Sequence, residues 1–225
     1  QEAMHAKAHS GGISHFLESQ GMEVRSFIKQ IEWLFDHALH DHPFSHQLPK
    51  PFEREWLVLR LGLIAAVEHF TCILGKYALE NKQWDNQSAD PTILDILRWH
   101  GAEEIEHRSV AFDVYQHLGG SYPMRYLQML IAFPLVMMFW VKGSSHLMVQ
   151  DPALASKQPR ALSMFFWREW QRKSSEGLLP SLPWLAKQAS RYFSPRYNPI
   201  KEASTQQAQD YLSQSPAALR AAAIT

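Results

Sequence analysis

Apolar residues recur every three or four positions along most of the chain, which is the spacing of helices that bury one face. The stretches Glu23 to Leu39 and Phe52 to Asn81 follow this pattern. A third stretch begins after Asp90-Pro91, a typical helix start, and runs to Gly119-Gly120, a typical helix end. We therefore predict an all-α fold, with the third stretch forming one continuous helix.

Polar side chains interrupt the apolar stripe of this third helix. On a helix turning about 100° per residue, His100, Glu104 and His107 fall within roughly 60° of one face. Apolar residues continue the same stripe: Ile96, Ala111, Val114 and Leu118. Burying an unpaired carboxylate costs several kcal/mol, so Glu104 needs a partner, and a metal ion suits the Glu-x-x-His spacing. Glu103 lies within about 40° of the His107 direction; we expect it beside the ligands, as a proton carrier or a bridging alternative.

Two further segments carry matching residues. Glu2 and His5 repeat the Glu-x-x-His spacing, although a frayed, solvated terminus is the alternative interpretation there. Glu68 lies in the middle of the apolar stripe of the second helix, without a lysine within one turn. His69 points about 100° away from Glu68, so we expect either a neighbour of the site or a core histidine bonded to a carbonyl group.

A ferritin-like bundle holds two metals with two Glu-x-x-His motifs and two single glutamates. Five of these six ligands are present, namely Glu2, His5, Glu68, Glu104 and His107, and His100 is an additional candidate. The sixth would be a glutamate on a helix preceding Gln1. The chain starts without Met, so we interpret it as a fragment whose first bundle helix is missing. We expect residues 1–150 to form this truncated di-metal bundle and residues 151–225 to form a short-helix extension packed on it.

Composition narrows the classes of function. Basic and acidic residues both number 22, so the chain has no net positive charge that would attract nucleic acid. We therefore expect no nucleic-acid partner. A single cysteine, Cys72, excludes an internal disulfide and a cysteine-based zinc cluster, which suits a cytoplasmic protein.

Membrane contact remains an alternative for two segments. Tyr126 to Val141 is strongly apolar but, at about 16 residues, short for a membrane span; we expect a helix buried against the bundle. Met164 to Trp170 places Phe165, Phe166 and Trp167 beside basic residues, a combination typical of membrane surfaces. Peripheral membrane contact and a homodimer are the associations that these segments suggest.

Three motifs resemble a known family: Gln1-Glu2-x-x-His5-x-x-x-His9, Ala66-Val67-Glu68-His69-Phe70-Thr71, and the segment from Trp99 to Tyr115. They are similar to the bacterial proteins catalogued as predicted metal-dependent hydrolases. The resemblance implies a ferritin-like di-metal fold in a cytoplasmic or membrane-associated protein, although the family's first helix is absent here. The arrangement of His100, Glu104 and His107 also resembles that of di-iron arylamine N-oxygenases.

The candidate ligands, Glu2, His5, Glu68, His100, Glu104 and His107, combine carboxylates with imidazoles and include no thiolate. Such a set suits two divalent metal ions, with iron favoured and manganese or zinc as alternatives. Iron would support oxygenation of an amine or lipid, and zinc or manganese would support hydrolysis of a small-molecule substrate. A metal-binding or membrane-associated helical protein without enzymatic activity is the third hypothesis.

Overall fold

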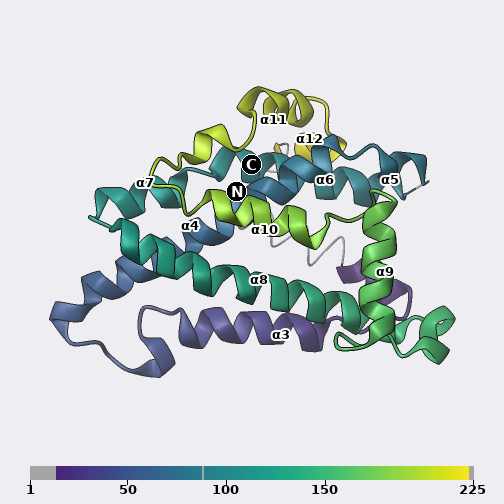
Figure 1. The fold of residues 1–225 in the computed structure, drawn as a ribbon, viewed down its shortest axis with the longest axis horizontal. Helices are drawn as coiled ribbons and strands as arrows, with labels where there is room; N and C mark the ends of the chain where they lie inside the picture. Colours follow the sequence, from purple (N-terminus) through teal and green to yellow (C-terminus); the bar gives the residue numbers. More distant parts are fainter. Residues whose placement is uncertain (1–13, 88, 223–225) are drawn as a thin grey trace.

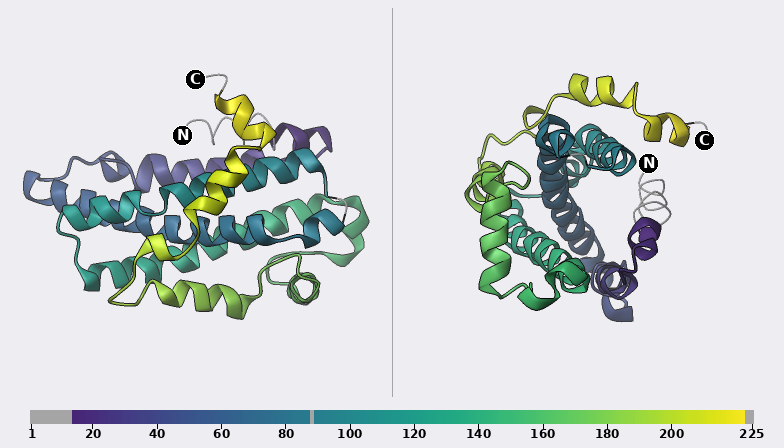
Figure 2. Two further views of the ribbon diagram at one scale, coloured as in Figure 1. Left: turned by 90° about the horizontal axis from the view of Figure 1, so that it is seen from above. Right: turned by 90° about the vertical axis from the view of Figure 1, so that its right-hand side faces the viewer.

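The computed structural model describes residues 14–87 and 89–222, and every regular element within these two ranges is helical. The predicted all-α fold is confirmed. The long helix α4 (Lys50–Glu80) lies at the centre of a bundle and packs against α6 (Pro91–His107), α7 (Val110–His117) and α8 (Tyr122–Gln150) (Figure 1, Figure 2). A short helix, α5 (Gln83–Asn86), lies in the connection between α4 and α6.

Helices α4 and α6 run antiparallel and meet at two glycines. A Cβ atom added to Gly75 would lie 2.3 Å from the carbonyl oxygen of Gly101, and one added to Gly101 would lie 2.7 Å from the Cα of Gly75. Both positions therefore require glycine for this close backbone approach. Asp90 caps α6, as predicted, because its carboxylate accepts hydrogen bonds from the amides of Thr92 and Ile93.

The predicted continuous helix from Pro91 to Leu118 is wrong, because the chain breaks between α6 and α7 at Arg108 and Ser109. The buried guanidinium of Arg108 donates hydrogen bonds to the carbonyl groups of Pro199 and Ile200 and to the Thr205 hydroxyl. The break also changes the direction of the apolar stripe: Ala111 is buried, but Val114, expected on the buried face, is 41% exposed.

Helix α8 carries the apolar run and continues through Pro134. Its buried face includes Arg125, Gln128, Met129 and Ala132. Its opposite face is about half exposed at Leu127, Leu130, Ile131 and Met138, so the expectation of a buried helix holds for one face only. Among the described residues, α4 and α8 are long and apolar enough to cross a membrane, a criterion that core helices of soluble proteins also meet.

The N-terminal helices precede α4 in the chain, and the helix Arg25–Trp33 lies along α8 (Figure 1). They are α2 (His15–Ser19), α3 (Arg25–Trp33), the π-helical turn η2 (Leu34–Ala38) and the short 3-10 helix η3 (Pro43–Ser45). The ring of Phe27 on α3 contacts Phe139 on α8, with the centroids 6.3 Å apart. The single helix expected from Glu23 to Leu39 is thus divided into an α-helix and a π-helical turn.

Between residues 152 and 222 the chain wraps around the bundle through short helices (Figure 1). They are η4 (Pro152–Lys157), α9 (Met164–Ser175), α10 (Leu182–Arg191), η5 (Pro199–Lys201), α11 (Thr205–Leu212) and α12 (Pro216–Ala222). Asp95 on α6 holds α11 and α12 against the bundle. Its carboxylate accepts hydrogen bonds from the Tyr211 and Ser215 hydroxyls and from the Ala217 amide, each 2.8 Å long.

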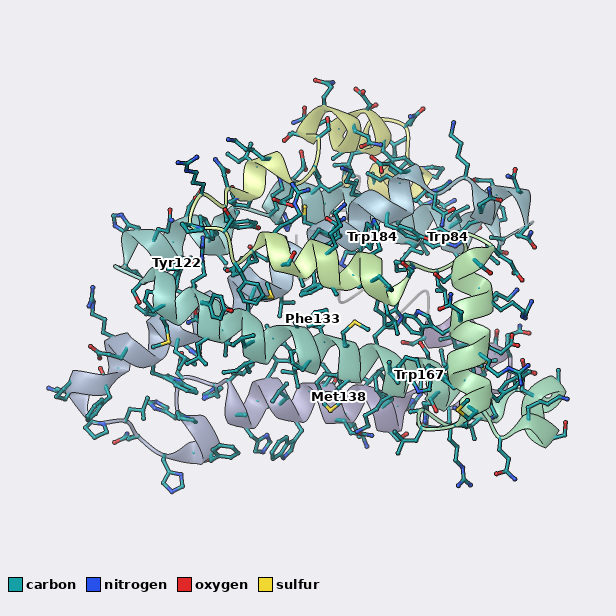
Figure 3. The ribbon with its side chains drawn as sticks, in the orientation of Figure 1. Trp84, Tyr122, Phe133, Met138, Trp167 and Trp184 are labelled. Carbon is teal, nitrogen blue, oxygen red and sulfur yellow. The ribbon has the colours of Figure 1, made fainter. Side chains whose placement is uncertain are left out.

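The aromatic residues of α9, which suggested peripheral membrane contact, differ in their exposure. Phe166 and Trp170 are buried and pack with Leu185 of α10, while Trp167 is partly buried against the same cluster. Figure 3 shows Trp167 where α9 meets α8. The basic Arg172 is engaged in ion pairs with Glu169 and Glu176. The exposed apolar residues near this helix are instead Leu162 and Met164.

Candidate metal centre

Glu104 is the most buried of the described candidate ligands, with 8% of its surface exposed. One of its carboxylate oxygens, Oε1, lies 2.9 Å from Nε2 of His100, one turn earlier on α6. The prediction that Glu104 is buried and needs a partner is therefore confirmed. This contact is also the usual ion-pair geometry of residues four apart on a helix, so the contact alone does not identify a metal site.

A residue of α4 approaches the other oxygen of Glu104. The Thr71 hydroxyl donates a hydrogen bond of 2.5 Å to Oε2 of Glu104. Thr71 lies three residues after Glu68, so the two share one face of α4. The bond therefore joins the Glu68 face of α4 to the Glu104 face of α6.

The break between α6 and α7 provides a partner for Glu68. In an unbroken helix the amide of Ala111 would be bonded to the carbonyl group of His107, but at the start of α7 it is available to another acceptor. It donates to Oε2 of Glu68 at 3.3 Å. Glu68 is partly buried, so this bond links a carboxylate inside the bundle to the first turn of α7.

The antiparallel register extends this arrangement. Gly75 of α4 lies against Gly101 of α6, and Thr71 of α4 contacts Glu104 of α6. Moving about one turn toward the N-terminus of α4 therefore corresponds to moving about one turn toward the C-terminus of α6. One more turn places Glu68 opposite the end of α6, where His107 lies. His107 and Glu103 are both partly buried. The register thus places Glu68 near the last turn of α6.

The described residues provide donors of the right kind but only part of a site. Within residues 14–87 and 89–222, no group of three or more His, Cys, Asp or Glu side chains is arranged to hold a metal ion. Glu2 and His5, with His9 beside them in the motif, lie outside the described residues. The di-metal site with these ligands therefore stays a prediction.

Comparison with known proteins addresses the family. The family model described as predicted metal-dependent hydrolase matches residues 1–203. The chain belongs to this family. The resemblance based on the three motifs is thus confirmed, whereas the likeness to arylamine N-oxygenases stays a prediction. No curated protein and no solved structure matches the chain.

All six candidate ligands of this metal-dependent hydrolase family member fall within the matched residues, and α11 and α12 lie beyond them. His69 is a structural residue: it is buried, with Nδ1 2.9 Å from the Tyr197 hydroxyl and Nε2 3.0 Å from the Gln188 carbonyl oxygen. Burial lowers the pKa of His69 to about 4. The interpretation as a core histidine bonded to a carbonyl group is confirmed.

Cys72 is a buried core residue. Its thiol is buried, and burial raises its pKa to about 12. The thiol packs in the core cluster with Ala102 and Ile105 of α6. The sequence reasoning missed Thr71 and the Ala111 amide. The spacing of Glu68 and Thr71 could have indicated Thr71, but the amide becomes available only through the helix break.

Proposed function

We propose that this chain is a metal-dependent hydrolase whose centre is formed by Glu68, His100, Glu104 and His107 together with Glu2 and His5. The observation that carries this proposal is the hydrogen bond of 2.5 Å between Thr71 and Glu104. This bond lies at the interface of α4 and α6. It joins the buried Glu104 carboxylate to the face of α4 that bears Glu68. Membership of the hydrolase family supports the same conclusion.

Carboxylate and imidazole donors suit two divalent ions, with iron favoured and manganese or zinc as alternatives. When bound, such ions lower the pKa of a coordinated water and hold the substrate oxygen, whereas iron additionally supports chemistry with dioxygen. The protein residues have separate tasks. Glu68 and Glu104 would hold the metal ions through their carboxylates, and Glu68 also accepts a hydrogen bond from the Ala111 amide.

Glu103 is the proton carrier in this proposal. It is partly buried and lies one turn before His107 on α6, so its carboxylate is close to the ligands without being one of them. From this position it accepts a proton from the attacking water and returns it to the leaving group. Replacing it with glutamine keeps its size and removes this capacity. The proposal thus expects Glu103→Gln to retain bound metal and to lose turnover.

Oxygenation of an amine or a lipid is the second candidate function. The favouring observation is the direct contact of His100 with Glu104, which places an additional imidazole next to a carboxylate ligand. A histidine in this position would add a nitrogen donor to the centre. An oxygen-dependent change in the absorption spectrum of the anaerobically reduced, iron-loaded protein would favour this function over hydrolysis.

The test of hydrolysis uses a panel of carboxylic and phosphoric esters with protein loaded separately with Zn²⁺, Mn²⁺ or Fe²⁺. The proposal expects turnover that a chelator abolishes and the metal restores. Glu104→Gln should abolish it. The neighbouring Glu106→Gln is the matched control, because the Glu106 carboxylate contacts Gln209 of α11 instead. Metal-independent turnover, or equal turnover in Glu104→Gln, would refute the proposal.

We further propose that α8 contacts a lipid surface through its outer stripe, defined as Leu127, Leu130, Ile131 and Met138. Each of these side chains is about half exposed, and no charged residue occurs between Arg125 and Lys142. Exposed tyrosines at the start of α8, Tyr122 and Tyr126, suit the interface between lipid and water. Figure 3 shows Tyr122 at one end of α8 and Met138 farther along it.

Sedimentation with phospholipid vesicles tests this contact. The double variant Leu130→Asp, Ile131→Asp should stay in the supernatant while the wild type sediments. Leu219→Asp is the control, since Leu219 is similarly exposed but lies on α12. Equal sedimentation of the double variant would refute lipid contact. A wild-type dimer that the double variant loses, without vesicle binding, would assign the outer stripe to a second copy of the chain.

A further inference from the structure

Thr71 has one hydroxyl hydrogen and two acceptors within reach. Its Oγ1 lies 2.5 Å from Oε2 of Glu104 and 3.2 Å from the backbone carbonyl oxygen of Glu68. A hydrogen bond to a carboxylate is charge-assisted, shorter and stronger than one to a neutral carbonyl group. The shorter contact therefore takes the hydrogen, and Thr71 acts as a donor from α4 to a carboxylate of α6.

The two oxygens of Glu104 are approached from different helices. Oε1 faces His100 on its own helix at 2.9 Å, while Oε2 faces Thr71 on α4. Two contacts at opposite ends of a carboxylate fix the direction and the plane of the group. A carboxylate has about four lone-pair sites, so a carboxylate that accepts one hydrogen bond on each oxygen is still able to bind a metal ion.

The side chain of threonine suits this task. Its branching at Cβ restricts χ1, so the hydroxyl needs little further ordering to reach Glu104. Valine has nearly the same shape but no donor, and serine has the donor without the methyl group. These two replacements separate the hydrogen bond from the packing at position 71.

We propose that Thr71 is a positioning residue that orients the Glu104 carboxylate for metal binding across the interface of α4 and α6. The inference rests on the proposed function, because it concerns the metal centre proposed there. Partners that orient a ligating carboxylate typically contribute 10- to 100-fold to metal affinity. The hydroxyl does not contact substrate; it acts through Glu104.

The test is titration of the full chain with Mn²⁺, with the free ion measured by electron paramagnetic resonance. Thr71→Val should raise the dissociation constant about 10- to 100-fold, whereas Thr71→Ser should stay close to the wild-type value. Thr92→Val is the control, because Thr92 is exposed in the first turn of α6. Thermal unfolding of the metal-free variants is measured in parallel.

If Thr71 has a purely structural role, metal-free Thr71→Val should have a lower melting temperature but an unchanged Mn²⁺ dissociation constant. This result would overturn the inference and leave the proposed function intact. A wild-type chain that binds no Mn²⁺, Zn²⁺ or Fe²⁺ would refute the proposed function itself and, with it, the inference. Should Thr71→Val fail to fold, Thr71→Ala carries the same comparison, since alanine also removes the hydroxyl and is the strongest helix former.

Discussion

The close approach of α4 and α6 predicts that Gly75→Ala destabilises the protein, although alanine normally stabilises helices. The added Cβ would lie 2.3 Å from the Gly101 carbonyl oxygen, whereas ordinary contacts begin at 3.4 Å. The obstacle is backbone, which cannot rotate away. The two helices must therefore separate by about 1 Å, a gap that forfeits a quarter to a half of the dispersion energy of each contact across it.

The expected magnitude follows from two opposing effects. Overpacking costs up to about 3 kcal/mol, and it applies here to an interface that includes the buried residues Cys72, Ala102 and Ile105. Replacing glycine by alanine inside a helix returns about 1 kcal/mol. We expect a net loss of about 2 kcal/mol in the free energy of unfolding. The bond between Thr71 and Glu104 lies one turn away and should lengthen as well, so metal affinity should also fall.

The assay is urea unfolding followed by far-ultraviolet circular dichroism, with the denaturant dependence compared between variants. Gly143→Ala is the matched control: its Cβ would meet the ring of Phe27 at 2.9 Å, a side chain that can shift, so this variant should keep wild-type stability or exceed it. The reasoning would be refuted if Gly75→Ala were as stable as the wild type, because the helices would then tolerate a Cβ at their crossing.

Two further predictions concern the packing around the centre. Asp95→Ala should release α11 and α12, because three hydrogen bonds to the Asp95 carboxylate are lost. Limited proteolysis should then remove the chain after about residue 203. A cleavage pattern identical to that of the wild type would contradict this prediction. The lowered pKa of His69, about 4 against an ordinary 6.5, means that the unfolded state binds more protons between these values. The free energy of unfolding should therefore fall by about 3 kcal/mol as pH falls from 6.5 to 4. His69→Gln should lose this part of the pH dependence, and an unchanged slope in that variant would contradict the assignment.

The sequence was most informative where a local pattern determines the structure. The spacing of apolar residues predicted α4 and α6, Asp90 predicted the start of α6, and the position of Glu104 on an apolar stripe predicted its burial. Each of these depends on residues within a few turns of one another, so periodicity and capping rules apply directly.

The helix break at Arg108 could not be predicted in this way. Arg108 donates hydrogen bonds to the local carbonyl group of Ile105 and to residues 199–205, about ninety positions away. Nothing near Arg108 in the sequence indicates the distant partners. The same break displaces Val114 from the buried face and makes the Ala111 amide available to Glu68. This part of the candidate site therefore depends on tertiary contacts.

An amphipathic pattern also does not identify the element that packs against the apolar face of a helix. The aromatic residues of α9 suggested a membrane surface, but Phe166 and Trp170 fill a core with α10. The apolar run in α8 suggested a buried helix, yet its outer stripe is exposed. In both cases the packing partner is distant in sequence, and hydrophobicity alone left the choice open.

The central claim is that this hydrolase family member holds its metal through glutamate and histidine side chains of α4 and α6. Elemental analysis of the full chain, compared with Glu104→Gln and the control Glu106→Gln, tests it most directly. The account predicts about two divalent metal ions per chain in the wild type and in Glu106→Gln, with loss of metal in Glu104→Gln. No stoichiometric metal in the wild type, or equal metal in all three proteins, would contradict it.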